Sequence, residues 1–128
     1  MSATVDRTLP ASVAETAVRR GLGAFLDVRE EAAVRSPGVS AGPRVNYLYE
    51  GGIVQRRRSA VSVIAWPDLI GMSPLYGRSH GHEGEVLAYR LDGRDGTSFA
   101  VAVILADNRD PFLDQAIEHV RGNGGVIG

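Results

Sequence analysis

The sequence predicts an α+β protein in which a curled antiparallel sheet, or partly open β-barrel, is capped by a C-terminal α-helix. Three features predict it: strand-like alternation over residues 45–66, a second strand pair between residues 85 and 105, and one amphipathic helix after residue 107. An open sheet followed by a single amphipathic helix is typical of folds in which the helix covers one face or end of the sheet. A further helix is expected as an N-terminal appendage.

The first sheet strands are predicted from side-chain alternation. Residues 45–50 alternate between two faces, and Gly51-Gly52 is expected to take the positive backbone angles of a tight hairpin. Residues 53–58 form the returning strand and residues 60–66 a third. Pro67 ends the third strand because proline has no amide donor and disfavours helix at the preceding residue.

The rest of the main body is predicted from turn and helix signals. Residues 73–84 are polar and rich in glycine, so we expect an exposed loop. Residues 85–91 and 98–105 are predicted as a second hairpin, joined by the turn-forming segment 92–96. The last helix should begin with Asp110 as N-cap and Pro111 in the first position, and end at Gly122.

The N-terminal region is less regular. A helix is expected from Pro10 to a stop at Gly21, with one apolar face formed by Val13, Ala14, Ala17 and Val18. Between residues 21 and 42 a short strand near Phe25 and a helical turn near residues 30–35 are both compatible with the sequence, so we treat this part as a connecting segment. The predicted organisation is therefore an N-terminal helix with connector (1–42), a main domain (43–122) and a flexible tail (123–128).

Composition limits the function. The chain has 128 residues, no cysteine and a net charge of −1, which excludes disulfides, thiolate chemistry and a general attraction to nucleic acid or anionic membranes. All 14 basic residues are arginine, so mechanisms that need a lysine amine are excluded. No apolar run is long enough to cross a bilayer, and the expected location is the cytoplasm.

Two segments carry a resemblance to a known family. Residues 47–54, YLYEGGIV, and residues 64–70, IAWPDLI, are similar to the first hairpin and the tryptophan-ended third strand of bacterial pleckstrin-homology-like (PH-like) domains. The predicted C-terminal helix falls where the capping helix of that fold belongs, so the resemblance covers about residues 43–122. The fold normally has seven strands, of which five are placed here.

The resemblance implies a non-enzymatic binding or adaptor module without a cofactor. We expect it to dock a protein segment, or a second copy of itself, along an exposed strand edge by backbone pairing. Fold alone does not define function, so each candidate residue is considered separately.

The strongest local positive charge is the run Arg56, Arg57 and Arg58. Side chains alternate along a strand, so Arg56 and Arg58 share one face and Arg57 points to the other. At most two of the three arginines can therefore converge on one carboxylate or phosphate. A solvated edge is the alternative interpretation. The short turn at Gly51-Gly52 and the lack of interleaved aromatic residues argue against acidic lipid and nucleic acid as ligands.

The weak candidates for metal binding are His80, His82 and Glu85. Two histidines two residues apart in an extended segment point the same way, and the carboxylate adds an oxygen ligand. The segment is also similar to the first motif of the cupin family, one residue short in spacing, which implies a metal-dependent enzyme acting on a small molecule. The second cupin motif is missing, and a polar loop is the alternative. We interpret His119, in the last helix, as a surface residue.

Trp66 has two interpretations. A tryptophan at a strand end is usually a core anchor, but its indole also suits a ligand-stacking platform. It is therefore retained as a candidate partner-binding residue beside Arg56 and Arg58.

Overall fold

The computed structural model describes residues 9–32, 34–36, 39–76, 86–104 and 109–128 of the chain. Its helices and strands are, in chain order, α2 (Ala11–Arg19), β1 (Phe25–Glu31), β2 (Val34–Ser36), β3 (Val39–Ala41), β4 (Arg44–Tyr49), β5 (Gly52–Arg57), β6 (Ala60–Ala65), the 3-10 turn η1 (Trp66–Asp68), β7 (Leu69–Tyr76), β8 (Val86–Gly93), β9 (Ser98–Ala102), α3 (Pro111–Gly122) and β10 (Val126–Ile127).

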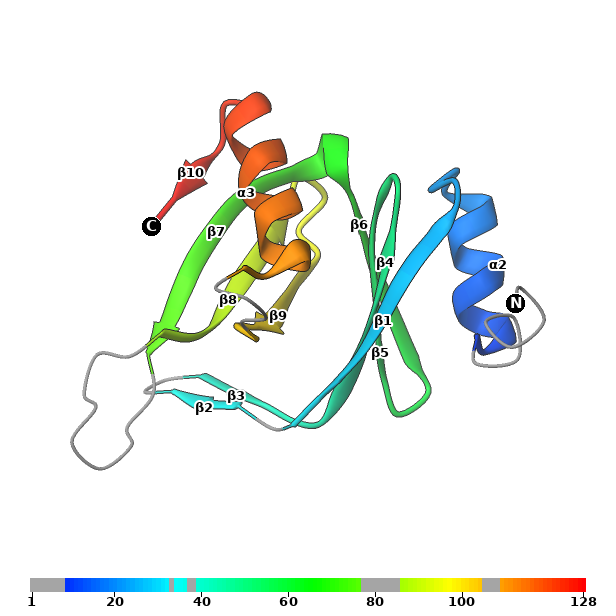
Figure 1. Ribbon diagram of the computed structural model, residues 1–128, viewed down its shortest axis with the longest axis horizontal. Helices are drawn as coiled ribbons and strands as arrows, with labels where there is room; N and C mark the ends of the chain where they lie inside the picture. Colours follow the sequence, from blue (N-terminus) through cyan, green and yellow to red (C-terminus); the bar gives the residue numbers. More distant parts are fainter. Residues whose placement is uncertain (1–8, 33, 37–38, 77–85, 105–108) are drawn as a thin grey trace.

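The strands form two four-stranded sheets and one small hairpin. The first sheet has the order β1-β4-β5-β6 and is antiparallel throughout, whereas the second, β10-β7-β8-β9, gains one parallel pair at β10. Within the described ranges, strands β2 and β3 pair with each other and with no further strand. The α+β class and the C-terminal helix are confirmed, but the strands form two sheets that do not close into a barrel (Figure 1).

The main core lies between the two sheets and α3. Strand alternation sends one face of the first sheet and one face of the second into it, and α3 adds its apolar stripe. The buried members of this core are Leu48, Ile53, Ile64, Trp66, Leu69, Met72, Leu91, Phe99, Val101, Phe112, Leu113, Ala116 and Val120.

Helix α2 covers the opposite face of the first sheet, on the side away from α3 (Figure 1). It buries Val13 and Ala17 against Tyr47, Tyr49 and Val54. The expected stop is confirmed, because Gly21 has a positive φ of 64°. The predicted apolar face is wider than the buried one, because Val18 is 82% exposed.

The segment between residues 21 and 42 is not a plain connector. Strand β1 pairs along its length with β4, from Phe25 opposite Tyr49 to Glu31 opposite Arg44, and β2 and β3 follow as a hairpin. The N-terminal region therefore contributes an edge strand to the first sheet. The prediction missed it because Arg29 and Glu31 occupy positions that a sequence pattern expects to be apolar.

The hairpin between β4 and β5 is confirmed, but the role of its glycines is different from the one expected. Tyr49 pairs with Gly52, so the two-residue loop is Glu50-Gly51, and neither Gly51 nor Gly52 has a positive φ. A Cβ atom on Gly52 would lie 2.5 Å from the carbonyl oxygen of Ile64. Glycine is needed there because two backbones approach closely.

Two further predictions are corrected in the second sheet. Residues 73–76, expected in a loop, belong to β7, where Met72 and Leu75 are buried and the strand pairs with β8. The tail expected at residues 123–128 contains β10, which pairs with Gly71 and Met72. The hairpin of β8 and β9 is confirmed.

The start of α3 matches the prediction. The Asp110 side chain accepts hydrogen bonds from the amides of Phe112 and Leu113, and Pro111 takes the first helical position. At the other end, the Asn123 amide donates to the carbonyls of Trp66 and Leu69, which ties the helix to η1. Among the described residues, no helix has the length and apolar character needed to span a membrane.

Candidate functional site

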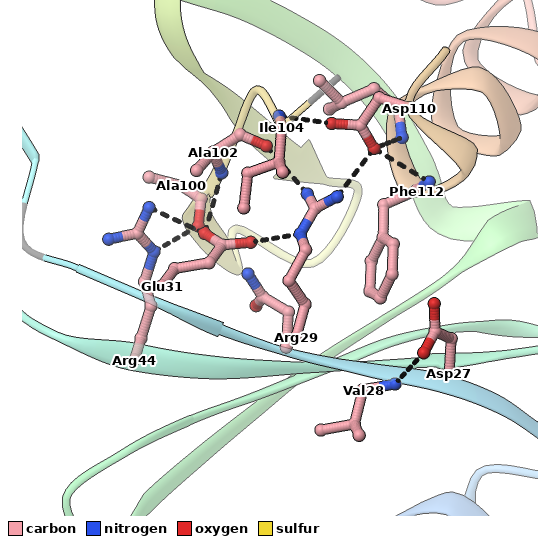
Figure 2. Close-up of polar contacts among 12 residues, drawn as sticks. Asp27, Val28, Arg29, Glu31, Arg44, Ala100, Ala102, Ile104, Asp110 and Phe112 are labelled. Atoms are coloured by element: carbon pink, nitrogen blue, oxygen red, sulfur yellow. Dashed lines mark hydrogen bonds and ion pairs between the residues drawn. The ribbon is translucent and has the colours of Figure 1, made fainter. Parts of the chain in front are cut away.

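Four charged side chains form a buried ion network between the two sheets (Figure 2). Arg29 and Glu31 come from β1, Arg44 from β4, and Asp110 from the start of α3. Glu31 pairs with Arg44 at 2.8 Å and with Arg29 at 3.1 Å, and Arg29 pairs with Asp110 at 2.8 Å. The side chains of Glu31 and Arg44 are fully buried. Two positive and two negative groups balance, so the network carries no net charge.

The network also covers the unpaired edge of β9. Arg44 and Gln55 donate to the carbonyl of Ala100, Arg29 donates to the carbonyl of Ala102, and the amide of Ala102 donates to Glu31 (2.8 Å). Backbone groups that a neighbouring strand would bind are bound here by side chains of the first sheet. The two sheets are therefore joined at this edge without direct strand pairing.

The polar groups of the network are used within the protein. Burial lowers the pKa of Arg44, and the carboxylate of Glu31 acts in the opposite direction. The Arg29 guanidinium also stacks on Phe112, 4.2 Å from the ring centre. Because nearly every donor is occupied, we interpret the network as a structural lock rather than as a reaction centre.

Sequence reasoning missed Arg29, Glu31 and Arg44. The signal that could have found them is the spacing of two residues between Arg29 and Glu31, which places both on one face of a strand. This signal is weak because charged side chains are seldom fully buried unless they are paired, and the sequence alone does not show which residues pair.

A second feature is a hollow of about 480 Å³ at the ends of β1, β4 and β5. We call it the arginine hollow, and its lining residues are Glu30, Glu31, Ala32, Pro43, Arg44, Val45, Arg56 and Arg58. Arg56 and Arg58 both line it, although Arg58 lies in the turn after β5 and not in the strand. Arg57 lines a smaller space between the sheets, beside Gln55 and Ser62, and a further hollow beside Pro43 that Arg58 lines as well.

Arg56 is held in a defined orientation. Its Nη1 donates to the carbonyl of Arg58 (3.0 Å), and its Nε lies 3.5 Å from the hydroxyl of Tyr47. Arg58 has a positive φ of 56°, which is unusual for a residue other than glycine. Within the part of the chain that the structure describes, Arg56, Arg57 and Arg58 make no ion pair.

A third feature is the outer edge of β1, which pairs with β4 on its other side and with no strand among the described residues on this one. Leu26 and Val28 are 50% and 37% exposed on this strand. The amide of Val28 donates to the neighbouring carboxylate of Asp27 at 2.8 Å in an exposed hydrogen bond (Figure 2). We call this segment, Leu26 to Glu30, the β1 edge. Its C-terminal end leads into the arginine hollow.

The remaining candidates are placed differently. Trp66 is 3% exposed and lies in the main core, where its Nε1 donates to the carbonyl of Glu50 (3.0 Å), so it has the position of a core anchor. His119, expected on the surface, is half-buried and stacks on Trp66 with ring centres 4.9 Å apart. His80, His82 and Glu85 lie outside the described residues, and the metal-site hypothesis stays a prediction. Elsewhere in the described chain, no three potential metal ligands come together.

We expect Tyr49→Phe to raise the free energy of unfolding by about 1 kcal/mol, because the hydroxyl of Tyr49 is buried without a hydrogen-bond partner among the described residues. Burial also raises the pKa of Tyr49, so the native state favours the neutral phenol. The contribution of the neutral Tyr49 phenol to the free energy of unfolding is complete below about pH 10 and is lost as the pH rises further. Urea unfolding of Tyr49→Phe should therefore show a smaller alkaline loss than the parent.

The matched control for this prediction is Tyr76→Phe, since Tyr76 is 46% exposed. Equal alkaline losses in the two variants would contradict the assignment to Tyr49.

Comparisons of the chain with protein families, curated proteins and solved structures find no match. The functional argument therefore depends on the described geometry.

Proposed function

We propose that the protein is a non-enzymatic binding module that docks an extended segment of a partner protein along the β1 edge. The observation that carries the proposal is that β1 offers an open outer edge with two exposed apolar side chains, Leu26 and Val28. An added strand gains backbone hydrogen bonds at such an edge and apolar contacts on alternate residues. The resemblance to PH-like domains supports the same class of function and stays a proposal.

The contrast with β9 supports this choice of edge. The outer backbone groups of β9 at Ala100 and Ala102 are occupied by Arg29, Glu31, Arg44 and Gln55. At the β1 edge, the protection consists of one exposed side-chain bond, from the Val28 amide to Asp27. A docking strand has to displace only that carboxylate to reach the Val28 donor.

A partner segment suits the edge better than a second copy. An antiparallel pair of two β1 strands centred on Val28 would place apolar Leu26 opposite charged Glu30, and one centred on Asp27 would place two Asp27 carboxylates together. The first arrangement also places Asp27 opposite Arg29, but Arg29 is already bound to Glu31 and Asp110, and the second opposes like charges.

The test uses a neutral peptide of about eight alternating valine and threonine residues with blocked ends, a length typical of a strand. In NMR titrations we expect the amide signals of the β1 edge to shift. Val28→Pro should remove binding, because proline lacks the donor, and Asp27→Ala should strengthen it severalfold by freeing that donor. Both variants should keep the parent fold by circular dichroism.

The matched control is Val18→Ala, because Val18 is the most exposed of the large apolar residues and lies on α2. This variant should bind like the parent. Absence of binding to the parent, shifts confined to β6, or unchanged binding by Val28→Pro would overturn the proposal. Sedimentation equilibrium tests self-association. If the parent is a dimer and Val28→Pro is a monomer, the β1 edge binds a second copy of the chain instead of a partner segment.

A further inference from the structure

The arginine hollow carries positive charge that the described residues do not fully neutralise. Of its charged side chains, Arg44 and Glu31 pair with each other at 2.8 Å. Arg56 and Arg58 have no carboxylate within ion-pair distance among the described residues, and Glu30 is exposed. The lining therefore has an excess of one positive charge, concentrated on two neighbouring guanidinium groups.

Glu30 lies near Arg56 in the sheet, and the two form no ion pair in the described part of the chain. The strand registers place Glu30 opposite Val45 and Val45 opposite Arg56, so the two charged residues lie on either side of Val45 in one row across the sheet. With neighbouring strands about 4.8 Å apart, the Glu30 and Arg56 backbones are separated by about 10 Å. Long side chains can span that separation, so Glu30 weakens the positive field and competes with an incoming anion for Arg56.

Arg56 is pre-organised to bind an anion. Its bonds to the Arg58 carbonyl and toward Tyr47 fix the guanidinium plane but leave Nη2 and one hydrogen of Nη1 unused. The same bond supports the left-handed backbone of Arg58, a conformation that is unfavourable for a residue with a Cβ atom. The turn thereby holds Arg58 on the same hollow as Arg56. Less side-chain entropy is lost on binding when a guanidinium is already ordered.

We infer that the arginine hollow binds the carboxylate of an acidic side chain in the segment that docks on the β1 edge. This inference rests on the proposed function. Glu30 and Glu31 at the end of β1, with the following Ala32, form one wall of the hollow. Arg56 lies two strands farther in, so the acidic side chain has to come from the part of the segment that continues past the β1 edge into the hollow. Two guanidinium groups on one hollow match the planar, two-oxygen geometry of a carboxylate.

The experiment compares the neutral valine-threonine peptide with two versions that carry a pair of glutamates at one end or the other. Calorimetry should show about tenfold tighter binding of one acidic version to the parent protein, a difference of about 1.4 kcal/mol. This gain should shrink in high salt because the anion is bound near the surface. In Arg56→Gln and Arg58→Gln the acidic and neutral peptides should bind equally, whereas Glu30→Gln should strengthen acidic binding severalfold.

The matched control is Arg121→Gln, which removes an exposed arginine from the last turn of α3. It should keep the full preference for the acidic peptide, and thermal unfolding should confirm that every variant is folded. If the parent binds all peptides equally at the β1 edge, the edge function stands and the inference about the hollow fails.

Two other probes separate the remaining outcomes. If no peptide binds but inorganic phosphate shifts the Arg56 and Arg58 signals, both the proposed function and the carboxylate assignment are overturned. A second outcome is that vesicles with anionic lipid bind the parent protein but not Arg56→Gln, and that no peptide binds. The ligand is then a membrane surface, and the inference fails as well.

Discussion

Glu31→Gln should lower the free energy of unfolding by about 3–5 kcal/mol, the largest effect that we expect from a single substitution in this chain. The carboxylate of Glu31 binds Arg29, Arg44 and the amide of Ala102, and its side chain is fully buried. Replacing it by an amide leaves two buried guanidinium groups without their shared counter-charge. Urea unfolding followed by circular dichroism measures the loss.

Its control is one residue away on the same strand. Glu30 is exposed, so Glu30→Gln should change stability by no more than about 0.5 kcal/mol. Similar losses in the two variants would show that the ion network contributes little to stability. Arg44→Met is a second test of the same lock, since it leaves the carbonyl of Ala100 with one donor fewer.

Gly52→Ala should destabilise the protein by about 2–3 kcal/mol, as expected for overpacking in a place that is already filled. The new methyl group would lie 2.5 Å from the Ile64 carbonyl oxygen and 2.9 Å from the Cα of Ala65, so β5 and β6 have to move apart. Thermal and urea unfolding both report the change.

Gly42→Ala is the matched control for Gly52. Nothing lies within 4 Å of a Cβ at Gly42, and its φ is not positive, so the substitution should be close to neutral. A neutral Gly52→Ala would mean that the hairpin adjusts easily and that glycine is present there for another reason.

The elements that sequence reasoning predicted are those with local signals. The start of α3 is encoded by Asp110 and Pro111 themselves, β4 and β6 alternate apolar residues along their length, and β5 is indicated by the hairpin turn before it. A turn, a cap or a period of two depends on residues that are close in the chain. Such signals can therefore be recognised without knowing the rest of the fold.

The missed elements depend on distant partners. Strand β1 buries Arg29 and Glu31, which makes sense only beside Arg44 and Asp110. Strand β7 includes Ser73 and Pro74, which resemble loop residues until β8 is placed beside them. Of the candidate site, the sequence indicated the charge of Arg56 and Arg58, but it did not predict that Arg58 lies in a turn, and the β1 edge required the missed strand.

The ion network has a consequence for the order in which the chain folds. The bonds from β1 to β9 and α3 join residues 71, 73 and 81 positions apart in the sequence. Such distant contacts carry a large loop-closure entropy and are typical of slow folding. During synthesis on the ribosome, the network stays incomplete until nearly the whole chain has emerged. An N-terminal fragment ending before β9 keeps the pairs of Glu31 with Arg29 and Arg44 but lacks the Ala102 and Asp110 groups that bury them.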